Sequence, residues 1–154
     1  MNEITIKPIA YVTNERVELK DDFWGNVISE ITLTEEFPAE ALDGIEEFTH
    51  LEILFHFHKA TDRNIVWNSE HPRENPNYPK VGIFAQRKKN RPNLIGTTIV
   101  KLIKREGNKI IISNFDAING TPIIDIKPIM QEFLPSEKVS QPQWTTDLMK
   151  DYWK

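Results

Sequence analysis

The chain has 154 residues, of which 39% are hydrophobic and 27% charged, with 19 Lys and Arg against 23 Asp and Glu and no cysteine. This length fits a single domain with one core, and the composition is ordinary for a globular protein. Disulfide scaffolds and thiolate sites are excluded, and the net charge of -4 argues against bulk electrostatic binding of nucleic acid. No apolar run approaches the roughly 20 residues that cross a bilayer, and no signal-peptide core is present, so we expect a cytoplasmic protein.

Most segments of the chain have the patterns of β-strands. The expected strands cover residues 4–12, 27–33, 50–58, 81–85, 97–104, 109–115 and 123–126. The clearest covers residues 50–58, where Leu51, Ile53, Phe55 and Phe57 share one face. Residues 105–108 have the composition of a hairpin turn. Short strands with little helix between them predict an antiparallel barrel or sandwich.

Helical patterns are few. Residues 38–48 predict one or two helical turns, and residues 147–153 predict a short terminal helix after Pro142. Residues 68–79 form a long loop with three prolines, a feature that is usually functional inside a small domain. We expect a domain over residues 1–135 and a tail over residues 136–154 that packs on it, since Trp144 and Trp153 would otherwise be exposed.

Three histidines in the strand at residues 50–58 are the first candidates for chemistry. His56 and His58 are two residues apart, so both point to one side of the strand, and His50 or Glu52 could add a further metal ligand. A histidine satisfied by its surroundings is the favoured alternative, and no metal site is expected. Nucleophile elbows, P-loops and dinucleotide-binding glycine motifs are absent, and the six glycines are scattered.

A basic segment and a charged strand are the other candidates. Residues 87–91 carry four Lys or Arg residues, which form either an anion clamp or a solvated loop. With Arg73 from the proline-containing loop, they would give a basic face on an acidic protein. Asp125 and Lys127 lie two residues apart on one strand, as a surface ion pair or as polar groups of a pocket.

Three ordered segments resemble a known family. LDGIEEFTHLEILFHFH at 42–58, VGIFAQRKKNRPNLIG at 81–96 and FDAINGTPIIDIKP at 115–128 resemble the TsaA-like (YaeB) family of S-adenosylmethionine-dependent methyltransferases. The resemblance covers roughly residues 4–130. It implies an antiparallel β-barrel, a homodimer, and methyl transfer to N6 of threonylcarbamoyladenosine beside the anticodon of tRNA.

The resemblance also implies site residues, position by position. The residues implied for cofactor binding are Trp24, Gly25, His58, Lys59, Arg87, Arg91, Asn93, Gly96, Asp125, Ile126, Lys127 and Pro128. Apolar walls for the sulfonium are expected near Phe57 and Phe84. Substrate binding is expected from Arg73, Lys88 and Lys89, which carry the charge suited to RNA phosphates.

Three functional hypotheses follow. The first is a tRNA methyltransferase, in which Asp125, His56 or His58 is the candidate base and Trp24, Tyr78 or Trp67 stacks on a splayed nucleotide. The second keeps S-adenosylmethionine and changes the acceptor to a small molecule or another RNA. The third is a non-catalytic module that binds S-adenosylmethionine.

Overall fold

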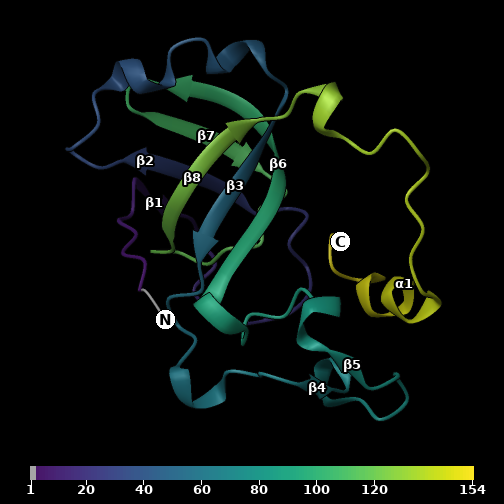
Figure 1. The fold of residues 1–154 in the computed structure, drawn as a ribbon. Helices are drawn as coiled ribbons and strands as arrows, with labels where there is room; N and C mark the ends of the chain where they lie inside the picture. The colour runs from purple at the N-terminus through teal and green to yellow at the C-terminus, as the bar shows by residue number, and fades with distance from the viewer. Residues whose placement is uncertain (1–2) are drawn as a thin grey trace.

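The computed structural model describes residues 3–154, and its main body is a closed barrel of six antiparallel strands. The strand order is β1-β2-β7-β6-β3-β8 (Figure 1). In that order the strands are Ala10–Thr13, Ile28–Leu33, Lys109–Ser113, Ile95–Glu106, His50–His56 and Pro122–Pro128. The mainly β architecture and the antiparallel barrel predicted from the sequence are therefore confirmed.

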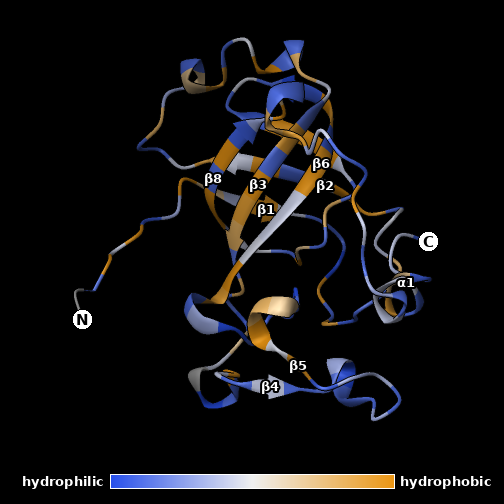
Figure 2. Ribbon diagram, turned by 45° about the vertical axis from the view of Figure 1, so that its right-hand side comes forward, coloured by the Kyte–Doolittle hydropathy of each residue, from blue (hydrophilic) through white to orange (hydrophobic). Residues whose placement is uncertain are grey.

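The barrel forms because alternate side chains of its strands face one interior. Leu51, Ile53 and Phe55 of β3 are buried, while the residues between them are partly or fully exposed. Figure 2 shows the hydrophobic residues gathered in the barrel strands. The two-residue turn Gly107–Asn108 joins β6 to β7, and Gly107 has a φ of 61°, which suits glycine. This confirms the predicted hairpin.

The first predicted strand is shorter than its sequence pattern indicated. Residues 4–8 have no strand structure, and β1 begins only at Ala10. Pro8 has no N–H to donate to a ladder, and the first backbone bond to the barrel comes from the Ile9 N–H to the Ile123 carbonyl at 2.8 Å. Alternation alone overlooked this break.

Two short 3-10 turns, Ala39–Leu42 and Ile45–Glu47, lie between β2 and β3, as the helical turns predicted for residues 38–48. They bury Leu42 and Ile45 against one end of the barrel core. Arg105 near the end of β6 donates to the Asp43 carboxylate at 2.9 Å and holds this segment in place. No helix in the described part of the chain is both long and apolar enough to span a membrane.

The chain between β3 and β6 forms a separate feature, which we call the lobe (residues 58–94). It contains the two-stranded sheet of β4, Ser69–Glu70, and β5, Val81–Gly82. Figures 1 and 2 show it beyond one end of the barrel, with a mostly hydrophilic ribbon. The strand predicted at 81–85 ends at Gly82, because Ile83–Ala85 turn into a 3-10 helix.

After β8 the chain runs as an exposed arm and then returns to the lobe. The arm contains the 3-10 turn Gln131–Phe133, and the only α-helix of the described residues, α1, covers Gln143–Met149. Figure 1 shows the arm arching away from the barrel and α1 lying near β4 and β5. The terminal helix predicted at 147–153 begins four residues earlier, directly after Pro142, whose extended backbone precedes the first turn.

Candidate functional site

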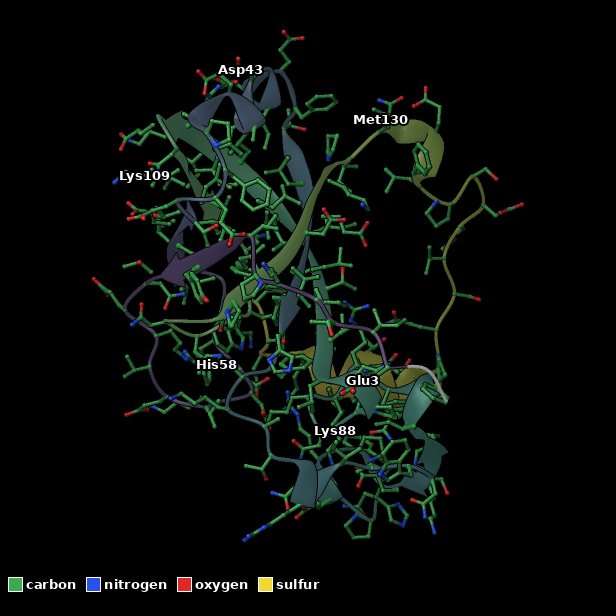
Figure 3. All side chains as sticks on the ribbon, turned by 60° about the vertical axis from the view of Figure 1, so that its left-hand side comes forward. Glu3, Asp43, His58, Lys88, Lys109 and Met130 are labelled. Carbon is green, nitrogen blue, oxygen red and sulfur yellow. The ribbon has the colours of Figure 1, made fainter. Side chains whose placement is uncertain are left out.

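The candidate site lies at the end of the barrel where the lobe leaves and rejoins it. His56 ends β3 and pairs with Ile95 at the start of β6. Two of the three segments that resemble the family, residues 42–58 and 81–96, therefore meet at this point. Figure 3 shows His58 at this junction and Asp43 at the opposite end of the barrel. Residues far apart in the sequence are thus brought to one edge.

The turn Arg91-Pro92-Asn93-Leu94 returns the chain to the barrel. Asn93 and Leu94 both have positive φ, at 65° and 53°, and Leu94 is buried. Gly96 follows on β6, where an added Cβ would stand 2.5 Å from Phe55 Cζ. Aromatic packing therefore requires the glycine, and asparagine is one of the residues that tolerate the left-handed turn. Asn93 and Gly96 therefore have a structural role in shaping the junction, independent of any role in binding.

Arg87 connects the lobe to β6 and keeps donors available. Its Nη2 donates to the Thr97 carbonyl, and its side chain is otherwise exposed. Arg91 braces the same loop, with Nη1 donating to the Gln86 carbonyl at 2.8 Å. Because a guanidinium has five N–H donors in a planar fork, Arg87 can also hold a carboxylate or phosphate.

The outward face of β6, β3 and β8 places acidic groups beside an apolar side chain. Leu54 pairs with Thr97 on one side and with Asp125 on the other. Glu52 accepts a hydrogen bond from the Thr97 hydroxyl at 3.0 Å. Asp125 pairs with Lys127, and this bond raises the pKa of Lys127. The carboxylates of Glu52 and Asp125 can accept hydrogen bonds from an ammonium group, and Leu54 can cover an apolar group.

The other expected residues of β8, at 126 and 128, do not lie on this outward face. Pro128 pairs with Leu51, four residues before Phe55 on β3, and so lies toward the other end of the barrel. There Ile126 and Pro128 line a groove with Phe48. Of the four expected residues at 125–128, only Asp125 and Lys127 share the outward face with Leu54 and Glu52.

The histidines are divided between the two ends of β3. His50, at the start of the strand, contacts the Thr49 hydroxyl at 2.8 Å, while His56 and His58 lie at the lobe junction. Burial lowers the pKa of His58, and electrostatic repulsion from the nearby Lys59 and His56 lowers it further. Among the side chains that the structure describes, no group of three His, Asp or Glu is arranged to hold a metal ion.

The C-terminal residues cover the expected Trp24–Gly25 segment. The Trp24 N–H donates to the Tyr152 carbonyl at 2.8 Å, and the Phe23 N–H donates to the Asp151 carbonyl at 3.1 Å. A Cβ at Gly25 would overlap the Trp153 carbonyl oxygen. Trp24 itself is buried, at 5% exposure. The tail backbone, and not open space, lies against this segment.

Three residues of this region were missed in the sequence. The Tyr152 hydroxyl and the Thr98 hydroxyl both donate to the Asp116 carboxylate, one to each oxygen. Burial, together with the charge of Asp116, raises the pKa of Tyr152, and Arg87 lies near enough to offset part of that rise. The aromatic cluster in the tail hinted at packing, but nothing local identified Asp116 as its partner.

The basic residues expected to bind substrate are all paired with acids. Arg73 makes a two-pronged bond to Asp22 at 2.9 and 2.7 Å, which raises the pKa of Arg73. Lys89 lies 3.6 Å from Asp21, and Lys88 pairs with Glu70. The bonds to Asp21 and Asp22 fix the lobe to the loop before Trp24, while the Lys88 bond lies within the lobe.

Comparisons with known proteins bear on this architecture. The sequence matches the family described as tRNA-methyltransferase O N-terminal domain over residues 11–133, which include the barrel and the lobe. The crystal structure of TrmO from P. aeruginosa superposes with a TM-score of 0.74 at 26% identity, covering 92% of this chain and 62% of that chain.

Two relatives illustrate the range of the family. A human protein named tRNA (adenine(37)-N6)-methyltransferase is 42% identical over 105 residues, which are 68% of this chain and 23% of that protein. A probable S-adenosyl-L-methionine-binding protein of Pyrococcus abyssi is 36% identical over 140 residues, covering 88% of this chain and 73% of the relative. The chain thus spans about a quarter of the length of the human relative.

Proposed function

The chain belongs to the family of tRNA-methyltransferase O N-terminal domains, and on that premise we propose that it is an S-adenosylmethionine-dependent methyltransferase. The proposed acceptor is N6 of threonylcarbamoyladenosine next to the anticodon in tRNA. The match over residues 11–133 carries this proposal, because it spans both strands and the turn that build the junction around Arg87. The names of the human and archaeal relatives support the acceptor and the cofactor.

The residues at the junction fit S-adenosylmethionine chemically. Arg87 has donors for a carboxylate, Glu52 and Asp125 offer acceptors for an ammonium group, and Leu54 provides apolar surface between them. When bound, the cofactor supplies a methyl group activated by its positively charged sulfur. The chain's own contribution is to hold the methyl donor and the acceptor in line. Such positioning can lower the activation free energy of a group transfer substantially.

Among the three candidate bases, we favour His58. Each Asp125 oxygen already accepts one hydrogen bond, from the Ile126 N–H at 2.9 Å and from Lys127, and the acceptor positions that remain are the ones proposed for the cofactor's ammonium group. His58 has a lowered pKa, so its ring is largely neutral near pH 7 and a ring nitrogen can accept the N6 proton. The carbamoyl group makes that proton more acidic than one on a free amine, which suits a modest base.

We also propose that the protein works as a homodimer. The arm after β8 exposes several apolar side chains, among them Met130, Phe133, Leu134 and Val139. A second copy packing on the arm would cover them, since exposed apolar patches commonly mark protein contacts. The molar mass in solution, measured by light scattering, tests this assembly.

Two measurements test the proposed function. Calorimetry with S-adenosylmethionine should give binding in the wild type, a clear loss in Arg87→Ala, and wild-type affinity in Arg63→Ala, an exposed arginine of the lobe. Labelled methyl groups should then be transferred to tRNA that carries threonylcarbamoyladenosine and not to tRNA that lacks it. Equal cofactor affinity in the two arginine variants would place the donor site elsewhere, and transfer to neither tRNA would overturn the proposed acceptor.

A further inference from the structure

Two large aromatic side chains of the lobe face solvent just beyond one end of the ladder of β4 and β5. Trp67 is 73% exposed and Phe84 is 81% exposed. The ladder pairs Ser69 with Gly82, and the Ile83 N–H extends it by donating to the Asn68 carbonyl at 2.9 Å. Trp67 and Phe84 are each one residue beyond this bond, Trp67 before β4 and Phe84 in the 3-10 helix after β5.

The structure separates these residues from the other aromatic candidates for base stacking. Trp24 is buried beneath the Arg16 guanidinium, whose carbon lies 4.3 Å from the ring centre. Tyr78 packs against Trp144 of α1, with ring centres 6.2 Å apart. Trp67 therefore remains as the exposed candidate, and Phe84 adds a second exposed ring instead of an enclosed apolar wall.

The charge of the lobe is opposite to that of the rest of the chain. Residues 58–94 contain eight Lys or Arg and three Asp or Glu, a net charge of +5 in a chain whose total is -4. Although Arg73, Lys88 and Lys89 are paired, Lys59 and Lys80 are exposed, and no ion pair of either occurs among the described side chains. A positive surface with exposed rings suits a polyanion that also carries flat bases.

We propose that Trp67 and Phe84 form a stacking platform for unpaired bases of the RNA substrate, the nucleotides that flank the target adenosine. This inference rests on the proposed function. Aromatic rings bind splayed bases with little sequence preference, because every base has a flat π-face. Phe84 lies three residues before Arg87 in the sequence, so the platform and the proposed methyl donor site share one loop of the lobe.

Binding of a labelled anticodon stem-loop RNA by fluorescence anisotropy tests the platform. Trp67→Ala and Phe84→Ala should each weaken binding about tenfold, the range expected for loss of one stacked base. Phe37→Ala removes an exposed ring, 37% accessible, that lies just before the 3-10 turn Ala39–Leu42 and outside the lobe, and it should bind RNA like the wild type. Trp67→Phe should retain most of the affinity, and all four variants should keep wild-type affinity for S-adenosylmethionine, which a folding defect would not allow.

The outcomes separate the platform from the proposed function. Unchanged RNA affinity in both lobe alanine variants would overturn the platform, and if they still methylate tRNA the proposed function would stand without it. A different result is that the wild type binds tRNA without methylating it and that these variants lose RNA binding. This result would support the platform and overturn the proposed function. A change in oligomeric state with unchanged RNA affinity would make the rings a protein contact and also overturn the platform.

Discussion

The barrel and the lobe are held together by different forces. The barrel encloses a continuous apolar core that includes Leu51, Ile53 and Ile110, all fully buried. In the described lobe, the buried hydrophobic residues are Ile83 and Leu94, and its sheet consists of two strands of two residues each. The barrel is therefore stabilised chiefly by hydrophobic burial, and the lobe chiefly by polar contacts with its neighbours.

This difference assigns separate roles to the two regions. A densely packed barrel can position Leu54 and Asp125 with little motion, because interiors resist deformation, and its Thr97 carbonyl anchors Arg87 of the lobe. The lobe depends on Asp22 and on the α1 packing at Tyr78 for its position. Regions with few buried apolar contacts open at low free-energy cost, which suits a surface that adapts to RNA.

One truncation made in each region gives the largest expected contrast. Ile110→Ala in β7 should lower the free energy of unfolding by about 4 kcal/mol, and Ile83→Ala, also almost fully buried, by about half as much. The lobe loss is smaller because the lobe can open without the barrel. Urea denaturation measures both, and hydrogen exchange should show Ile83→Ala accelerating exchange mainly within residues 58–94. Equal losses would mean that barrel and lobe unfold as one unit.

Alanine substitutions at two glycines compare how well the barrel and the tail accommodate an added Cβ. Gly96→Ala forces a Cβ against the rings of Phe55 and Phe57 and should cost about 2–3 kcal/mol of global stability. Gly25→Ala meets the Trp153 carbonyl instead, and the last residues can move away, so about 1 kcal/mol is expected, with faster proteolysis of the tail. Gly82→Ala is the control, because a Cβ there meets open space. A larger loss at Gly25 than at Gly96 would make the tail part of the core.

The barrel could be predicted from the sequence because its determinants are local. Alternation in β3 and the Gly107 turn are each encoded within a few residues, so the strands and their hairpin follow from pattern alone. Element ends were less predictable. Pro142 indicated a helix start, yet the helix was expected four residues late because its apolar pattern is weak.

The candidate site could be predicted only in part, because its partners are distant in the chain. Arg73 and Asp22 are 51 residues apart, and Tyr152 and Asp116 are 36 apart. No local pattern shows that Arg73 is neutralised or that a tail residue donates to Asp116. The sequence identified which types of residue lie at the junction, but only the folded structure shows which of them pair with one another.

The ion pair between Asp22 and Arg73 links the loop before Trp24 to the lobe, and breaking it should lower the free energy of unfolding only modestly. Asp22→Asn removes the carboxylate charge paired with Arg73, and because the pair is near the surface it should cost about 0.5–1 kcal/mol, less at high salt. Glu18→Gln, which breaks an exposed pair with Lys20 outside this link, should leave lobe exchange unchanged. Thermal denaturation at two salt concentrations measures the effect, and a salt-independent loss would show that charge is not its cause.

The smallest expected effect is a pH dependence at the junction. Because the pKa of His58 in the folded chain lies below the ordinary histidine value of about 6.5, the unfolded chain binds more protons than the folded chain as the pH falls toward and below that value. The His58 contribution to stability is thus present above about pH 6.5 and lost on acidification through that range. His58→Gln should reduce this acid-side slope, while His50→Gln at the far end of β3 leaves the His58 contribution in place. NMR titration of the imidazole measures the pKa directly, and a His58 value above 6.5 would remove both this slope and the reason for preferring His58 as the base.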